Sequence, residues 1–197
     1  EIPNIGTLFT VPGGFEKVTY YGKGPHENYI GRNQGAFMGI HKTYADSMTI
    51  PYLEIGETGQ RTEVKWATLT NGNGMGLLIV GSPRMEFSAQ HYSPEQLNTV
   101  KLPWDLKRDN DITLRVDLHQ MGLGGINSWG AKPLDQYSLF PKQSYSHKFR
   151  ISPIRGKLED PTELANLGFK NLQTSNEVVD YPAIEYIKPE RKPFNDL

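Results

Sequence analysis

The sequence predicts an all-β fold for residues 1–154, followed by an irregular tail over residues 155–197. Short runs rich in β-branched and aromatic residues alternate apolar with polar positions, as half-buried strands do. Turn signals separate these runs, and eighteen of the twenty glycines precede residue 154. Helical signals are confined to two short segments. We therefore expect one β domain over residues 1–154 and no second packed domain after it.

Five runs carry the strand pattern, and each is expected to form a strand: residues 15–21, 62–69, 76–80, 112–118 and 146–151. Between the second and the third of them stands Asn71-Gly72-Asn73-Gly74. Asn and Gly accept left-handed backbone conformations, which tight turns between antiparallel strands require. The sequence therefore predicts a hairpin around this turn.

Two segments carry helix-start signals. Ser93 is followed by Pro94, with Gln96 three residues after the serine, which is typical of a capped first turn. Asp160 and Pro161 repeat the arrangement in the tail. The remainder of the tail carries spaced prolines and is expected to be extended or disordered.

The composition excludes several functions. With 21 basic and 22 acidic residues the net charge is −1, which gives no footprint for nucleic acid or for an anionic membrane. The absence of cysteine excludes disulfides, Cys-based zinc sites and a thiol nucleophile. No uncharged apolar run approaches the ~20 residues of a membrane span. The chain begins at Glu1 without a signal-type region, so we expect a piece of a longer protein; a cytoplasmic or a periplasmic location both stay open.

Candidate catalytic groups have no local support. No two of the five histidines stand at a metal-ligand spacing, so a metal site would have to be assembled from distant strands. Four glutamates could supply an acid/base pair, but each is expected to cap a turn or form an ion pair. No metal ligand and no catalytic residue is therefore predicted in this chain; the groups considered are His26, His41, His91, His119, His147, Glu27, Glu54, Glu57 and Glu63.

One segment stands out, the glycine-rich loop of residues 121–130. Three glycines in four positions, Gly122, Gly124 and Gly125, precede Trp129. A tryptophan in such a loop either fills a gap in the core or offers a flat platform for a ligand such as a sugar ring. Asn127 and Ser128 would then bond the sugar hydroxyls. Burial is the usual fate of a large aromatic side chain, and both interpretations stay open on the residues alone.

Three segments, in this order along the chain, resemble the C-terminal small-chain domain (domain 5) of family 2 β-galactosidases. Residues 21–32 resemble its G-x-G-P-x-E-N-Y-x-D-R signature, residues 57–66 its P-Q-E-x-G-x-R-x-x-x-R-W segment, and residues 117–130 its D-x-x-x-M-G-x-G-G-x-x-S-W loop. The match covers about residues 2–154. Its motif residues outside the loop are Gly22, Gly24, Pro25, Glu27, Asn28, Tyr29, Arg32, Glu57, Gly59, Arg61 and Trp66.

The chain departs from the family pattern at three places. Gly31 stands where the family has Asp, Ile55 and Gly56 replace Pro-Gln, and Lys65 replaces an Arg. The last change would turn a bidentate contact into a point charge. The family domain also begins about a hundred residues earlier, so the resemblance implies a sandwich without its N-terminal strands. Strand edges left exposed in this way favour pairing with another chain, and hence a homo-oligomer.

The resemblance implies a β-supersandwich similar to galactose mutarotase, and a non-catalytic role. In the family, two glutamates of a separate (β/α)₈ barrel hydrolyse terminal β-D-galactosides with retention, and magnesium, with sodium as a further ion, binds on that barrel. The small-chain domain covers the barrel mouth, and a tryptophan matching Trp129 forms a wall of the sugar site. Glu27, Arg32, Glu57 and Arg61 are expected to fix turns or form ion pairs. The expected partners are the barrel of the same polypeptide and a β-galactoside.

Two alternatives stay open. The chain could be a stand-alone carbohydrate-binding or subunit-contact module. It could also be an aldose epimerase of the mutarotase type, with two histidines and a glutamate as acid and base. The supersandwich permits that chemistry, but fold alone does not confer it.

Overall fold

The computed structural model describes residues 1–125, 127, 129–156 and 160–167. Residues Glu1–Leu167 form one compact unit, and a second unit spans Gly168–Leu197, so the predicted extended end of the tail lies outside the described residues. The boundary expected between residues 154 and 155 stays a prediction. None of the helices in the described part of the chain is long and apolar enough to cross a lipid bilayer.

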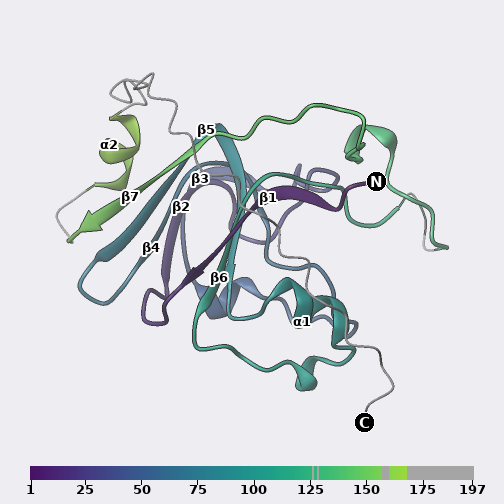
Figure 1. Cartoon of the computed structure of the whole chain (residues 1–197), viewed down its shortest axis with the longest axis horizontal. Coiled ribbons are helices and arrows are strands. Elements are labelled where there is room, and N and C mark those ends of the chain that lie inside the picture. Colours follow the sequence, from purple (N-terminus) through teal and green to yellow (C-terminus); the bar gives the residue numbers. More distant parts are fainter. Residues whose placement is uncertain (126, 128, 157–159, 168–197) are drawn as a thin grey trace, which may run out of the picture. The chain divides into compact units, whose positions relative to one another are not determined.

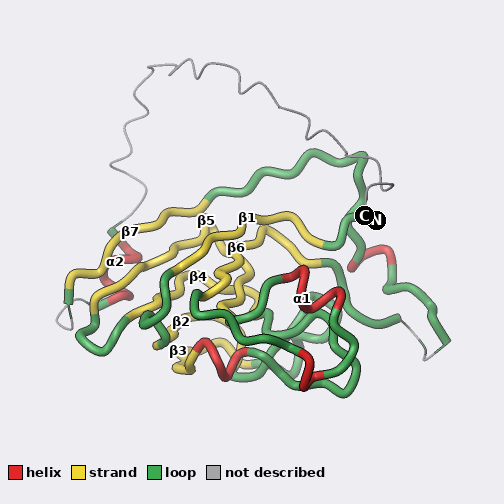
Figure 2. Tube along the Cα trace, turned by 60° about the horizontal axis from the view of Figure 1, so that its bottom comes forward, coloured by secondary structure: helices red, strands yellow, loops and turns green. Residues whose placement is uncertain are grey.

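The described chain is built on one seven-stranded antiparallel sheet, which confirms the all-β prediction (Figure 1; Figure 2). Its order is β1-β6-β5-β4-β2-β3, and β7 also pairs with β5. The strand bounds are β1 Asn4–Val11, β2 Lys17–Gly24, β3 Phe37–Tyr44, β4 Arg61–Thr70, β5 Met75–Gln90, β6 Ile112–Gln120 and β7 Phe149–Arg155.

The long strand β5 organises the sheet. Its first half, from Met75 to Gly81, pairs with β7, and its second half, from Glu86 to Gln90, pairs with β6. The two shorter strands thus lie end to end along the same edge of β5, while β4 runs along the other edge. This arrangement brings the polar end of β6 next to the second half of β5.

Local signals behave as the sequence indicates. In the turn between β4 and β5, the Asn71 side chain accepts hydrogen bonds from the amides of Asn73 and Met75, at 2.9 and 3.1 Å. Helix α1 (Pro94–Thr99) begins after Ser93, whose hydroxyl accepts from the Gln96 amide. Helix α2 (Pro161–Asn166) is capped by Asp160 in the same way. The predicted hairpin and both predicted helices are confirmed. Three short 3₁₀ turns complete the described elements: η1 Ala45–Met48, η2 Pro103–Asp105 and η3 Asp135–Tyr137.

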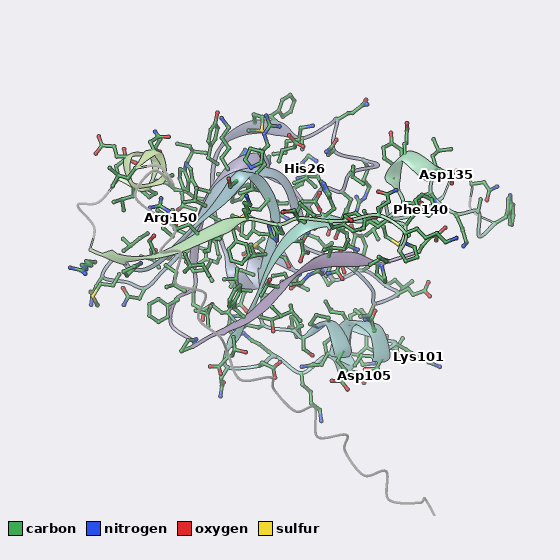
Figure 3. The ribbon with its side chains drawn as sticks, turned by 45° about the horizontal axis from the view of Figure 1, so that its top comes forward. His26, Lys101, Asp105, Asp135, Phe140 and Arg150 are labelled. Atoms are coloured by element: carbon green, nitrogen blue, oxygen red, sulfur yellow. The ribbon has the colours of Figure 1, made fainter. Side chains whose placement is uncertain are left out.

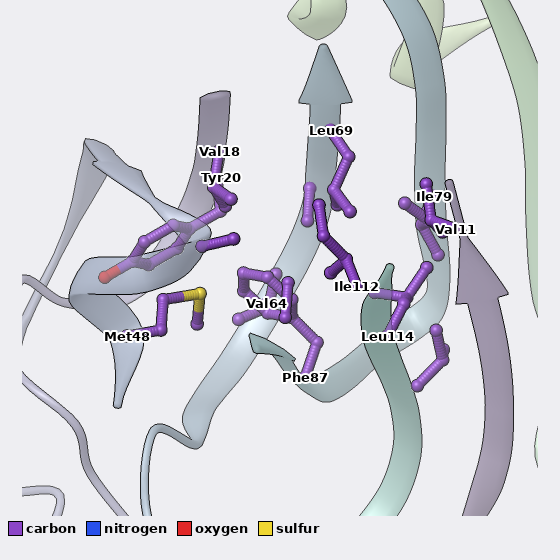
Figure 4. Packing of buried hydrophobic residues seen from close by; sticks show 14 of the residues in the cluster. Val11, Val18, Tyr20, Met48, Val64, Leu69, Ile79, Phe87, Ile112 and Leu114 are labelled. Carbon is purple, nitrogen blue, oxygen red and sulfur yellow. The ribbon is translucent and has the colours of Figure 1, made fainter. Parts of the chain in front are cut away.

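The second half of β5, for which no strand was predicted, and most of β6 are buried on both faces. For β6 the alternating pattern had indicated a strand half exposed to solvent. One face of these strands carries Phe87 and Leu114 into the apolar core, which Figure 4 shows in close-up. The opposite face carries Glu86, Arg115 and Asp117, and these are also at most 5% exposed. The expectation of a solvent-facing polar side is therefore wrong here, because a polar network covers it.

Candidate functional site

The glycine-rich loop follows β6 directly, and its base is fixed by backbone hydrogen bonds. The Gly122 amide donates to the carbonyl of Tyr137 at 2.7 Å, and the Met121 amide donates to Pro3 at 2.9 Å. The returning segment contains η3; Figure 3 labels Asp135, in η3, and Phe140, just after it. The chain therefore leaves and re-enters the body at neighbouring points.

Gly125 is required by the packing of this base. A Cβ added to Gly125 would lie 1.5 Å from the carbonyl oxygen of Ala131, so no other residue fits without movement of the backbone. Gly124 has a φ of +73°, in the region that favours glycine. Both glycines thus have a reason within the loop itself.

Trp129 is 90% exposed, so it does not fill a gap in the core of the described chain. Its backbone amide donates to the side-chain oxygen of Asn127 at 2.9 Å, and the Ala131 amide donates to the same oxygen at 3.4 Å. Asn127, which was expected to bond a sugar hydroxyl, therefore uses its side-chain oxygen to shape the turn around the tryptophan. The third predicted contact residue, Ser128, lies outside the described residues.

A cavity of about 300 Å³ lies at the base of this loop. Its lining joins the first motif to the third, because Gly31 and Arg32 face Gly122, Gly124 and Gly125 across it, with Tyr137 as the aromatic wall. A Cβ on Gly31 would lie 3.6 Å from the Tyr137 ring. Gly31, which stands where the resemblance predicts an aspartate, therefore leaves this space open.

Glu27 is the centre of the first motif. Its carboxylate is 4% exposed and accepts hydrogen bonds from the Gly59 amide at 2.7 Å, from Arg32 at 2.6 Å and from the hydroxyls of Thr58 and Tyr52. Burial raises the pKa of this carboxyl, but the four hydrogen bonds together outweigh burial and hold its pKa below the usual value. Glu27 is therefore an ionised anchor that joins the first motif to the second.

Three further motif residues hold the same junction. The side-chain oxygen of Asn28 accepts from the Thr62 amide at 3.1 Å, and the Asn28 amide group donates to the carbonyl of His26. Arg61 donates to the Tyr20 hydroxyl at 3.1 Å and to the carbonyl of Gly59 at 3.0 Å. Gly59 itself has a φ of +85°. These contacts fix turns and leave no group free for acid or base work.

A second buried network holds the start of the glycine-rich loop. Arg115 donates to Glu57 at 2.6 Å, to Asp117 at 2.8 Å and to the side chain of Gln120 at 2.6 Å. The Gln120 amide donates to Glu86 at 2.9 Å. Because Gln120 is the last residue of β6, this network fixes the point from which the loop departs.

Burial is the largest influence on the pKa of Glu57. It raises this pKa above the usual value, and the nearby Arg115 charge offsets only part of the increase. A carboxyl with a raised pKa is a candidate general acid. Here its oxygen is already bound by Arg115, so the arrangement serves an ion pair rather than proton transfer.

Sequence reasoning missed Arg115, Gln120 and Glu86 as supports of the loop. Arg115 and Asp117 occupy alternate positions of β6, and that alternation indicated a solvent-facing side. The one signal for their role was their position in the sequence, because both lie a few residues before Gly122 of the loop. The motif tryptophan Trp66 is also part of the body, at 3% exposure, whereas Trp129 and Trp104 are exposed.

These features define an all-β domain that presents an exposed aromatic side chain on a loop with a fixed base. The family model of the beta galactosidase small chain matches residues 1–151. The chain therefore belongs to the beta galactosidase small chain family.

Relatives similar to this chain carry the name beta-galactosidase. The protein of Priestia megaterium is 43% identical over 154 residues, and that of Streptococcus thermophilus is 31% identical over 155 residues. The protein of Halalkalibacterium halodurans is 30% identical over 156 residues. Each comparison covers 78% of this chain and 15% of the relative, so the chain spans about 15% of the length of the relatives it matches.

Proposed function

We propose that this chain is a non-catalytic part of a family 2 β-galactosidase. The catalytic glutamates and the ions, magnesium and also sodium, belong on a barrel elsewhere in the same polypeptide, which hydrolyses terminal β-D-galactosides with retention. This domain covers the mouth of that barrel, and Trp129 forms an aromatic wall of the sugar subsite. The family membership of the chain and the names of its relatives support this proposal.

The exposure of Trp129 is the observation that carries the proposal. At 90% exposed, its ring offers a flat apolar face of the kind on which the C–H-rich face of a sugar lies. Glu27 and Glu57 are the carboxylates that come closest to qualifying as catalytic groups. Glu27 forms an ion pair with Arg32, and Glu57 forms one with Arg115. These ion pairs support a binding role rather than a catalytic one.

The test is Trp129→Ala in the complete β-galactosidase polypeptide. Loss of a platform that holds substrate and transition state alike raises KM more than it lowers kcat. Trp104→Ala is the matched control, because Trp104 is also exposed, at 72%, but lies in η2, outside the glycine-rich loop. An unchanged KM in the Trp129 variant, with the fold intact, would remove Trp129 from the sugar subsite.

The 197-residue chain alone should hydrolyse no chromogenic galactoside, and detectable hydrolysis would contradict the non-catalytic assignment. Calorimetric titration with galactose and lactose separates the stand-alone binding module from the accessory domain. A Kd tighter than about 1 mM, which corresponds to ~4 kcal/mol, would favour the module.

A subunit-contact role is supported by strand β3. It is an edge of the sheet, and its side chains Phe37, Ile40 and Tyr44 are each more than half exposed. An exposed apolar edge strand favours pairing with another chain. Sedimentation of the chain at increasing concentration tests this role, and a monomer throughout would exclude self-pairing through β3.

A further inference from the structure

Three side chains of metal-ligand type meet outside the glycine-rich loop and its supports. Glu16 lies just before β2, Asp46 lies in η1, and His91 directly follows β5. Their ligand atoms all lie within 4.8 Å of one another. His91 is fully buried, and its Nε2 atom lies 2.7 Å from Glu16 and 3.8 Å from Asp46. The cluster therefore combines one imidazole with two carboxylates.

Second contacts orient two of these ligands toward the centre. The Nδ1 atom of His91 lies 2.9 Å from the carbonyl oxygen of Asp109, an atom that only accepts hydrogen bonds. The other ring nitrogen, Nε2, faces the cluster. One oxygen of Glu16 accepts from the Gly14 amide at 3.2 Å, which leaves the other oxygen facing His91. Metal-binding histidines are held in this way by a backbone carbonyl on the other ring nitrogen.

The two short contacts of His91 Nε2 cannot both be hydrogen bonds. Besides Glu16, the Arg108 guanidinium lies 2.9 Å from Nε2. The Glu16 carboxylate offers only acceptors and the Arg108 guanidinium only donors. A single ring nitrogen, with or without a proton, can therefore form a hydrogen bond to one of the two and not to both, so one short contact is mismatched.

Arg108 occupies the place of a cation in this cluster. It donates twice to Asp46, at 2.7 and 3.2 Å, and lies 4.0 Å from Glu16. One guanidinium charge thus faces two carboxylates. The Arg108 side chain is 44% exposed and has room to swing into solvent.

We propose that Glu16, Asp46 and His91 form a zinc site that Arg108 fills when no ion is bound. A Zn²⁺ ion in front of Nε2 relieves the mismatched contact, keeps the bond from His91 to Asp109 and neutralises both carboxylates. Tetrahedral ligands at ~2.0–2.1 Å from zinc lie ~3.4 Å apart, and the separations of 2.7 and 3.8 Å from Nε2 bracket that value. Water supplies the fourth ligand.

This site is of the kind that spacing along the chain cannot reveal. Glu16, Asp46 and His91 are separated by 30 and 45 positions, and only the fold brings them together. A bound ion would connect the start of β2, the turn η1 and the end of β5, and thus stabilise the folded chain. None of its three ligand residues is among those proposed for the sugar subsite.

The experiment is a calorimetric titration of the metal-stripped, full 197-residue chain with Zn²⁺. We expect one equivalent to bind and the thermal midpoint to rise. Asp46→Asn and Glu16→Gln should each weaken zinc binding by about tenfold or more, since each removes a ligand. Both side chains are partly exposed, so these variants should fold. Arg108→Ala should bind zinc more tightly by about tenfold, because it removes the competing cation.

Arg84→Ala is the matched control for the last variant. Arg84 is likewise a partly exposed arginine in a surface ion pair, with Glu63, and its loss should leave zinc affinity unchanged. His26→Ala controls for binding to an exposed histidine. The proposal is overturned if neither the wild type nor Arg108→Ala binds zinc, or if the Glu16 and Asp46 variants bind it as tightly as the wild type does.

Discussion

Replacing Glu27 by glutamine tests whether this carboxylate is the anchor that joins the first two sequence motifs. Glutamine has nearly the same shape but only one accepting oxygen. If that oxygen keeps the bonds from Thr58 and the Gly59 amide, the new NH₂ group faces Tyr52 and Arg32. The Tyr52 hydroxyl can turn to accept from it. The Arg32 guanidinium cannot, so one ion pair becomes a contact between two donors.

The structure sets the size of the effect. A hydrogen bond to a charged group contributes ~1.5–3 kcal/mol, and breaking a buried ion pair costs ~3–5 kcal/mol. Arg32 is 46% exposed, which weakens its share, so we expect a loss of about 3 kcal/mol in the free energy of unfolding. For a unit the size of Glu1–Leu167, ~1 kcal/mol corresponds to ~2–4 °C, so the thermal midpoint should fall by roughly 6–12 °C.

The assay is urea unfolding of the full chain near neutral pH, with Glu63→Gln as the control. Glu63 pairs with Arg84 in an exposed bridge, and its loss should cost at most about 1 kcal/mol. The pKa of Glu27 is lowered in the folded state, so its contribution is present above the unfolded pKa and disappears as the pH falls through the folded value. A Glu27→Gln loss no larger than that of the control would refute the anchor.

Three further outcomes are expected. Gly125→Ala should lose about 1–3 kcal/mol by overpacking against Ala131, measured by urea unfolding, whereas Gly72→Ala, with no atom near its Cβ, should change little. Arg115→Leu removes the cation that pairs with the carboxylates of Glu57 and Asp117, so it should destabilise the chain. In the β-galactosidase proposed above, it should also raise KM as the loop base shifts. The hydrogen bond to Glu86 raises the pKa of His119. The stability that this bond adds is fully present below about pH 6.5, the unfolded pKa, and is lost as the pH rises through the folded pKa. The free energy of unfolding of His119→Gln should therefore lie below that of the wild type in acid and match it in base.

Much of the fold could be predicted from local sequence, because β2, β4 and β6 alternate β-branched or aromatic residues with polar ones and contain no proline. The two edge strands, β1 and β3, could not be predicted in this way. β1 contains Gly6 and exposes most of its residues, and β3 contains Gly39 and is likewise largely exposed. An edge strand is held by its neighbour's backbone rather than by a buried face, so its sequence carries little alternation. β5 was predicted as five residues rather than sixteen because Pro83 interrupts its pattern.

The candidate site was predictable only where the sequence departs from ordinary composition. Three glycines beside Trp129 marked the loop, and the motif residues marked Glu27. The supports of the loop, Arg115 and Gln120, look like any polar positions on a strand. Their role depends on Glu57 and Glu86, which lie 58 and 34 positions away, and such pairings are decided by tertiary packing.

The contrast between the base and the tip of the loop argues for an external partner of Trp129. Burying an aromatic side chain removes ~150–250 Å² from water, worth ~4–6 kcal/mol at ~25 cal/mol per Å². Because Trp129 is 90% exposed, its burial contributes almost none of this free energy to the described chain. The base of the loop, in contrast, is held by backbone hydrogen bonds and by a buried ion network. A base that is already ordered lowers the entropy lost when the tip meets a second surface. The free energy that burial of Trp129 would contribute is therefore available to a contact outside the described chain.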